Sequence, residues 1–335
     1  EEAEAAINAI LLHDIGHGPF SHSLENSIID DINHEELSLL FMEKLNDELE
    51  GILNTAIRIY TNDYPKKFLH QLVTGQLDMD RLDYLKRDSF FTGVSEGVIN
   101  TDRIIKMLDV VDDNLVVEAK GIYSIEKLII ARRLMYWQVY LHKTVIAAEQ
   151  MLVKIMKRAK FLCRQGEKIF TTSALKLFLE NEICYDDFEN DPEILEFFSR
   201  IDDYDIFTCI KEWAWSDDKI LSALCSSMVN RQLFRTEIKP EAIPQNAVEA
   251  VTDAPTIQMG ISISEADYFV ITGRDRNSAY DPANDKINIS YRDGSLIDIS
   301  EASDQLNIDV LSKIVTKYFF CFPKQYSDVF NQEKR

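Results

Sequence analysis

Four of the six histidines in the 335-residue chain lie within its first 34 residues. They are His13, His17, His22 and His34. The first of them is followed directly by Asp14, in the string LLHDIGHGPFSHSLE. Imidazole and carboxylate groups together form the ligand set that a borderline divalent ion selects, and packing alone gives no reason to gather them. We therefore predict a metal-dependent site that includes His13 and Asp14.

The residues after Asp14 predict a break in regular structure. His13 and His17 are four apart and share a helix face if the helix continues that far. Gly16, Gly18 and Pro19 interrupt it. We expect His17 and His22 on an irregular turn beside the end of that helix.

A second group of polar residues lies in LDMDRLDYLKRDSFFTG, residues 77–93. On a helix, Asp80, Tyr84 and Asp88 share one face at spacings of four, and Arg81 flanks them. A carboxylate can bind metal, an arginine can bind phosphate through two hydrogen bonds, and a tyrosine can lie against a sugar or base. The alternative is a solvated helix face with ion pairs, which we prefer for the other charged residues of this string.

A third group lies in ARRLMYWQVYLHK, residues 131–143. Its cations and aromatic residues follow a helix that is otherwise mostly apolar. The candidates are Arg132, Tyr140, His142 and Lys143. A buried helix with polar ends is the alternative interpretation of this string.

The elements that position these residues are predicted to be mainly helical. Apolar periodicity predicts helix after helix over residues 1–165, including a long run from 124 to 159, with a break at Gly93 and Gly97. Residues 166–235 also read as helical. We expect a catalytic helical domain over 1–165, a helical extension over 166–240, and an α+β region over 241–335.

The pattern changes towards the C-terminus. The segment 239–255 holds three prolines and is predicted to be a connection. After it, GISISEADYFVITG and KINISYRDGSLIDIS alternate apolar and polar residues, and Asp293-Gly294 predicts a hairpin turn. A last helix is expected over about 308–318. The predicted fold class is thus mainly α with a smaller C-terminal α+β part.

Composition limits the classes of partner. The net charge of −21 argues against nucleic-acid binding, although a metal and local cations could still hold a small phosphorylated substrate. No stretch is apolar enough for a membrane span, and five scattered cysteines fit free thiols in a reducing cytoplasm. The chain begins in mid-pattern and without Met, so we expect further sequence before Glu1.

The motifs HDIGHGPFSH, His34-Glu35 and DMDRLDYLKRD together resemble the HD-domain deoxynucleoside triphosphate triphosphohydrolases. The resemblance covers residues 7–103 closely, extends to about 160, and is looser beyond. It implies an HD-domain helical bundle and a divalent metal: Mg²⁺ or Mn²⁺, with Fe, Zn, Ni or Co as alternatives in a crystal. It also implies a homo-oligomer and an activating nucleotide.

Carried over by motif, His13, Asp14 and Asp80 match metal ligands. The fourth ligand of the family is an upstream histidine, which we expect in the sequence before Glu1. His17, His22 and His34 match active-site histidines. Arg81 matches a cation on the phosphates, Tyr84 a tyrosine beside the sugar, and Asp88 an aspartate at the 3′-hydroxyl. The resemblance places Arg132, Tyr140, His142 and Lys143 on the substrate side.

The resemblance implies cleavage between the 5′-oxygen and the α-phosphorus, which yields a deoxynucleoside and tripolyphosphate. We nominate His22 as the proton donor, with His17 as its substitute and His34 as an orienting group. Arg81 would offset charge on the transferred group. Two alternatives stay open: an HD phosphohydrolase or phosphodiesterase that acts on another nucleotide, and a non-catalytic nucleotide-binding regulator.

Overall fold

The computed structural model of the chain describes residues 1–29, 31–283, 285–304 and 312–333. The chain forms two compact units, and each draws on separate stretches of sequence. Unit 1 comprises residues 1–15, 38–142 and 276–315, and unit 2 comprises 16–37, 143–275 and 316–335. These compact units do not test the domain boundaries predicted at residues 165 and 240, which stay a prediction.

Unit 1 is mostly helical. Its helices are α1 (Glu2–Leu12), most of α3 (His34–Glu48), α4 (Asn54–Tyr60), α5 (Lys67–Val73), α6 (Met79–Thr92), η2 (Ser95–Gly97), α7 (Thr101–Met107), η3 (Ala119–Gly121), α8 (Ile122–Met135), the π-helix η4 (Tyr136–Tyr140) and α17 (Ile299–Ala302). Helix α6 ends where predicted, because Gly93 adopts a left-handed conformation with φ of 71°.

A four-stranded sheet completes unit 1, in the order β1-β2-β5-β6. Its strands are β1 (Leu108–Val111), β2 (Asn114–Glu118), β5 (Asn288–Ser290) and β6 (Leu296–Asp298). Strand β2 pairs antiparallel with β1 and parallel with β5, where Val117 lies opposite Ile289. The predicted hairpin around Gly294 is confirmed, since β5 and β6 pair antiparallel.

Two apolar clusters hold unit 1 together. In one of them, α1 packs against α4 and α5 through the small residues Ala5 and Ala9. In the other, Leu82 and Leu85 of α6 pack against Leu128 and Ile129 of α8. The helices of unit 1 that carry candidate site residues are therefore anchored by buried apolar side chains.

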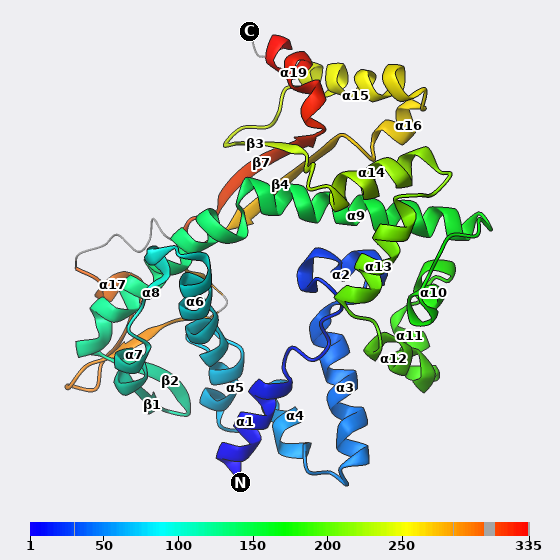
Figure 1. Cartoon of the computed structure of the whole chain (residues 1–335). Coiled ribbons are helices and arrows are strands. Elements are labelled where there is room, and N and C mark those ends of the chain that lie inside the picture. The colour runs from blue at the N-terminus through cyan, green and yellow to red at the C-terminus, as the bar shows by residue number, and fades with distance from the viewer. Residues whose placement is uncertain (30, 284, 305–311, 334–335) are drawn as a thin grey trace. The chain divides into compact units, whose positions relative to one another are not determined.

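Unit 2 is built around the long helix α9 (Lys143–Arg164). Besides the first turn of α3, its other described helices are η1 (Ser21–Ser23), α2 (Glu25–Ile28), α10 (Ser173–Glu180), α11 (Tyr185–Asn190), α12 (Pro192–Ser199), α13 (Asp203–Trp213), α14 (Lys219–Val229), α15 (Gln245–Met259), α16 (Ile263–Ala266), η5 (Lys324–Tyr326) and α19 (Ser327–Glu333). Strands β3 (Arg235–Lys239), β7 (Val315–Phe322) and β4 (Ile271–Asn277) form its sheet with β7 in the middle, and Figure 1 shows this sheet beside α9.

The fold class is confirmed: the chain is mainly helical, and most strands of its two small sheets come from the C-terminal part. The prediction of helix after helix over 1–165 is wrong at residues 108–118, which form the β1–β2 hairpin. The hairpin turn is Asp112-Asp113, and both residues have positive φ, as a tight turn between twisted strands requires.

Three predictions for the C-terminal part need correction. Segment 239–255 is not a connection throughout, because α15 begins at Gln245 and contains Pro255. Residues 263–266 form α16, and the strand begins only at Ile271. Of the last helix expected over 308–318, residues 308–311 lie outside the described part, and 315–318 belong to strand β7. β-Branched and aromatic side chains of that segment suit the central strand of a sheet.

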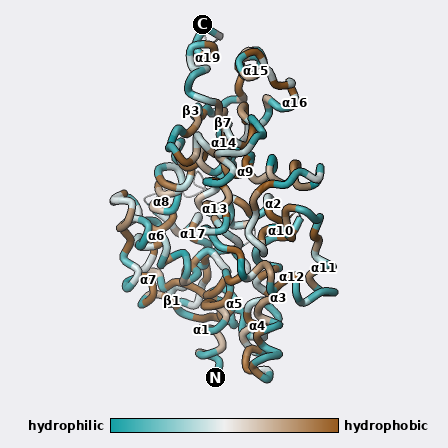
Figure 2. Tube along the Cα trace, turned by 45° about the vertical axis from the view of Figure 1, so that its right-hand side comes forward, coloured by the Kyte–Doolittle hydropathy of each residue, from teal (hydrophilic) through white to brown (hydrophobic). Residues whose placement is uncertain are grey.

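Colouring by hydropathy shows hydrophobic and hydrophilic stretches following one another along the tube (Figure 2). Among the described residues, every helix is too short or too polar to cross a bilayer.

Candidate active site

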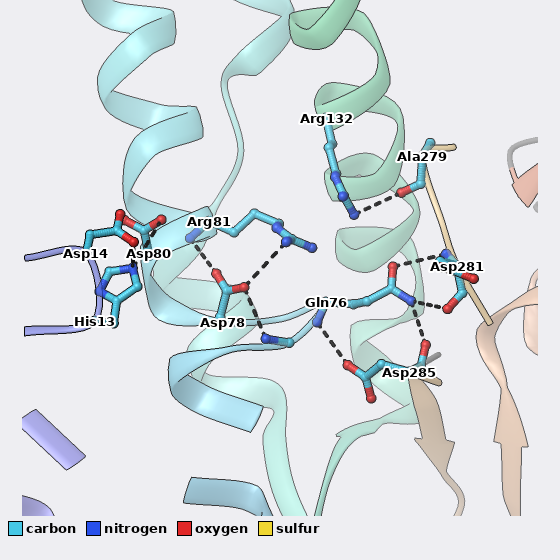
Figure 3. Close-up of polar contacts among 11 residues, drawn as sticks. His13, Asp14, Gln76, Asp78, Asp80, Arg81, Arg132, Ala279, Asp281 and Asp285 are labelled. Atoms are coloured by element: carbon cyan, nitrogen blue, oxygen red, sulfur yellow. Dashed lines mark hydrogen bonds and ion pairs between the residues drawn. The ribbon is translucent and has the colours of Figure 1, made fainter. Parts of the chain in front are cut away.

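His13, Asp14 and Asp80 converge in unit 1, as the sequence predicted. His13 caps the C-terminal end of α1, and Asp80 lies in the first turn of α6. The Nε2 atom of His13 lies 3.3 Å from Oδ1 of Asp14 and 4.0 Å from Oδ2 of Asp80. One ligand atom from each side chain lies within 4.8 Å of the other two. Figure 3 shows the imidazole and the two carboxylates facing one another.

This triad has the donor set of a divalent metal site. The Nδ1 atom of His13 lies 2.6 Å from the carbonyl oxygen of Ile10, which leaves Nε2 directed at the carboxylates. Burial is the main cause that raises the pKa of Asp80, and the charges of Asp14 and Asp78 raise it further, whereas the charges of His13 and Arg87 oppose them. A cation among these groups would offset that repulsion, so the residues present fit a divalent ion.

Two arginines of the same unit are the candidates for binding phosphate. Arg81 follows Asp80 on α6, and Arg132 lies on α8. The Nε atom of Arg81 is buried without a hydrogen-bond partner. Burial, and then the charge of Arg81, lower the pKa of Arg132. Figure 3 shows both side chains extending into the space between α6 and α8. The two positively charged guanidinium groups together favour the binding of an anion there.

Further along α6, Tyr84 and Asp88 meet the π-helix. The hydroxyl of Tyr140 donates a hydrogen bond of 2.7 Å to Asp88, and the ring centroids of Tyr84 and Tyr140 are 6.1 Å apart. Burial and the Asp88 carboxylate raise the pKa of Tyr140 well above its usual value. The structure thus joins the second and third groups of sequence candidates at this point.

The last two substrate-side candidates lie at the end of this segment. His142 is exposed and ends the middle stretch of unit 1, whereas Lys143 begins α9 in unit 2. There Lys143 lines a pocket that also contains Lys211, Arg231, Arg235 and Lys324. Sequence reasoning missed this basic pocket because its cations come from separate helices and strands.

The remaining histidines form a cluster in unit 2. Ring centroids of His17, His22 and His34 lie 4.1 to 4.9 Å from one another. The irregular turn that was expected here is present: Phe20 and Ser21 both have positive φ, before the short helix η1.

Glu25 organises this cluster, and sequence reasoning missed it. Its Oε1 atom accepts hydrogen bonds from the backbone N–H of His34, at 2.8 Å, and contacts Nδ1 of the same residue at 2.6 Å. Its Oε2 atom lies 3.3 Å from Nδ1 of His22. Burial alone would raise the pKa of Glu25, but the hydrogen bonds from His34 and His22 lower it to about 2. Its position three residues after His22 was the available signal.

The turn is fixed from two sides within unit 2. The backbone N–H of Phe20 donates to Asp203 at 2.9 Å, and the Ser23 hydroxyl donates to Glu149 at 3.1 Å. Gly18 lies so near Phe198 that an added Cβ would come within 3.1 Å of the ring. The histidine cluster is therefore held by a rigid turn.

The chain is similar to several known proteins. The family described as HD associated region matches residues 99–175. A phosphohydrolase from Bacteroides thetaiotaomicron has a solved structure with 55% identity and a TM-score of 0.91, over 96% of this chain and 80% of that one. The chain belongs to the HD-superfamily phosphohydrolases.

This member of the HD-superfamily phosphohydrolases is also similar to two curated proteins. Protein YwfO of Bacillus subtilis is 34% identical over 70% of this chain and 53% of its own length. A Dictyostelium discoideum protein named as a deoxynucleoside triphosphate triphosphohydrolase SAMHD1 homologue is 30% identical over 44% of this chain and 32% of its own. The chain thus spans only about half the length of YwfO and a third of the SAMHD1 homologue. The roles of the individual site residues remain predictions.

Proposed function

We propose that this HD-superfamily member hydrolyses deoxynucleoside triphosphates to a deoxynucleoside and inorganic tripolyphosphate. The observation that carries the proposal is the succession along α6 of Asp80, Arg81, Tyr84 and Asp88. This one helix offers a metal ligand, a phosphate-binding cation, and a tyrosine–carboxylate pair suited to a sugar. The similarity to the Dictyostelium relative, which is named as a deoxynucleoside triphosphate triphosphohydrolase SAMHD1 homologue, supports the same substrate class.

A divalent ion would be held by His13, Asp14 and Asp80, whose donor atoms lie close enough together. When bound, such an ion supplies Lewis acidity towards a phosphoryl oxygen. Two carboxylates and one imidazole suit Mn²⁺ or Mg²⁺.

Arg81 and Arg132 would bind the polyphosphate. The buried Nε of Arg81 is a donor that has no partner within the described protein, and a phosphate oxygen would satisfy it. Asp88, oriented by the hydroxyl of Tyr140, would accept a hydrogen bond from the 3′-hydroxyl of the sugar. Tyr84 would lie against the sugar ring.

His22 would give a proton to the leaving 5′-oxygen. Its Nδ1 contacts Glu25, so Nε2 is the atom left for the transfer, and this histidine–carboxylate arrangement is typical of a positioned acid. His34, held by Glu25, would orient the neighbouring imidazoles, and His17 would act as the substitute proton donor.

The wider proposal includes an activating nucleotide, a homo-oligomer and a cytoplasmic location. The basic pocket around Lys143 supports the activator, because five cations gather there in a chain of net charge −21.

Incubation of the protein with Mn²⁺ or Mg²⁺ and a panel of nucleotides tests the proposal. Release of tripolyphosphate and a deoxynucleoside, measured by ion chromatography, is the expected result. Release of orthophosphate or cleavage of a phosphodiester would instead support an HD phosphohydrolase with another substrate. Binding without products would support a regulator.

The metal ligands have a matched control on the same helix. Asp80→Asn should abolish turnover and weaken Mn²⁺ binding measured by calorimetry. Asp83→Asn changes an exposed carboxylate that pairs with Arg87, so this variant should behave like the wild type. Equal Mn²⁺ affinity in the two variants would exclude Asp80 as a ligand.

A further inference from the structure

A segment from the C-terminal part of the chain returns to the start of α6. We call residues 279–283 and 285–287 the strap. It belongs to unit 1 and leads into strand β5. Sequence reasoning found no role for this region beyond packing.

Gln76 joins the strap to the turn before α6. Its side-chain Nε2 donates to the carbonyl oxygens of Asp281, at 2.7 Å, and Asp285, at 2.5 Å. Its Oε1 accepts from the backbone N–H of Asp281 at 3.2 Å. Its own backbone N–H donates to the Asp285 carboxylate at 2.9 Å. The buried amide thus uses both its donors and its acceptor on the strap, as Figure 3 shows.

A second glutamine strengthens the same connection. Gln71 accepts from the backbone N–H of Leu115 on β2 at 2.8 Å, and its Nε2 lies 3.5 Å from the Asp285 carboxylate. Gly75 lies in the tightest part of the turn, where an added Cβ would come within 2.7 Å of the Gln71 carbonyl and 3.3 Å of Asp285. Several contacts therefore join the turn to the strap.

The other end of the strap reaches the second arginine. The carbonyl oxygen of Ala279 accepts a hydrogen bond of 3.3 Å from Nη1 of Arg132. The next residue, Tyr280, is fully buried, donates to the carboxylate of Asp298, and accepts from the backbone N–H of Ile287. Hence the strap is rigid between its contact with Arg132 and its contact with Gln76.

We propose that Gln76 is a positioning residue that, through the strap, sets the spacing between Arg81 and Arg132 for a polyphosphate. Two residues after Gln76, Asp78 accepts a 2.6 Å bond from the backbone N–H of Arg81 and forms an ion pair of 3.5 Å with its side chain. Arg81 is thus bound to Asp78 in the turn that carries Gln76, Gln76 binds the strap, and Ala279 of the strap binds Arg132. This inference rests on the proposed role of the two arginines in phosphate binding.

The side chain at position 76 must be an amide. A glutamate of the same shape would point oxygen atoms at the carbonyl groups of Asp281 and Asp285 and lose both donors. A like charge would also stand near the Asp285 carboxylate. The strap and the turn would separate, and with them the two guanidinium groups.

Binding of inorganic tripolyphosphate, measured by calorimetry, tests the inference independently of turnover. Gln76→Glu should weaken the affinity by about tenfold and raise the KM for a deoxynucleoside triphosphate more than it lowers kcat. If this variant does not fold, Asp285→Asn takes its place, with a smaller loss in the same direction. Gln165→Glu makes the same chemical change at an exposed position and should bind like the wild type.

Two results would overturn the inference. One is a folded Gln76→Glu variant with wild-type affinity for tripolyphosphate, even if its melting temperature falls, because a purely structural role predicts that result. The other is a wild-type protein that does not bind tripolyphosphate. A wild type that binds tripolyphosphate but does not release it from any deoxynucleoside triphosphate would contradict the proposed function and leave the positioning role standing.

Discussion

The histidine cluster depends on a single carboxylate. Glu25 contacts Nδ1 of both His22 and His34 and has a pKa lowered to about 2. It therefore keeps its negative charge at any pH at which the protein is assayed, and it fixes which ring nitrogen of each histidine faces away. Proton transfer in this cluster falls to the imidazoles.

His22 carries the first prediction. His22→Ala should lower kcat by about 10²- to 10⁴-fold, because the leaving oxygen loses its proton donor. The side chain is 70% exposed, so the melting temperature and the Mn²⁺ affinity should stay unchanged. Steady-state kinetics with tripolyphosphate detection checks this, and wild-type turnover would refute the assignment.

For single residues, the sequence was informative where the residue types and their spacing along the chain pointed to the same site. His13-Asp14 and the four-residue spacing on α6 predicted groups that do meet. Glu25, Gln76 and the basic pocket were out of reach, because their partners are brought together by folding. Gln76 and Asp285, for example, are 209 residues apart.

Helix α6 positions more candidate residues than any other described element, and its first turn is tightly capped. Asp78 is buried and accepts from the backbone N–H groups of Arg81, at 2.6 Å, and Gly75, at 3.3 Å. An N-cap of this kind satisfies donors that the helix itself cannot pair. The orientation of Asp80 and Arg81 follows from it.

Removal of this cap should therefore destabilise the protein. Asp78→Ala should lower the free energy of unfolding by about 1–2 kcal/mol, measured by urea denaturation. Asp83→Ala, which removes an exposed ion pair on the same helix, should cost at most about 0.5 kcal/mol. Equal losses in both variants would show that the cap contributes nothing special.

Helices and strands could be predicted where the apolar periodicity was regular. The predictions were wrong where tertiary contacts determined the secondary structure. The alternation that suggested a strand from 260 includes Ser262 and Glu265, which form a capping box and start α16. Prolines suggested a connection, but Pro255 is tolerated inside α15. The helix predicted near the C-terminus is in part strand β7, because β3 and β4 on its two sides supply its hydrogen bonds.

At the scale of the whole molecule, a large excess of acidic groups makes stability depend on pH. Within unit 2, Arg158 binds Asp218 through two hydrogen bonds, of 2.6 and 3.1 Å. Although burial alone would raise the pKa of Asp218, the bonds from Arg158 and from backbone N–H groups lower it overall. A depressed pKa contributes stability above the pKa of the unfolded chain, about 3.9, and this stability is lost as the pH falls through the folded value.

Asp218→Asn should consequently reduce stability at pH 7 and flatten its dependence on pH below about 4. Chemical denaturation at a series of pH values checks this. Asp217→Asn, at the neighbouring position, is the control and should leave the curve unchanged. The same acid-induced loss in Asp218→Asn as in the wild type would contradict the assignment.

The parallel pairing of β2 with β5 has a consequence for synthesis on the ribosome. Val117 lies opposite Ile289, 172 residues later in the chain (289 − 117). At about 5–20 residues per second, β2 emerges on the order of ten seconds or more before its neighbour exists. During that interval the strand presents an unsatisfied edge, so nascent chains of this protein should be substrates for chaperones that shield exposed strands.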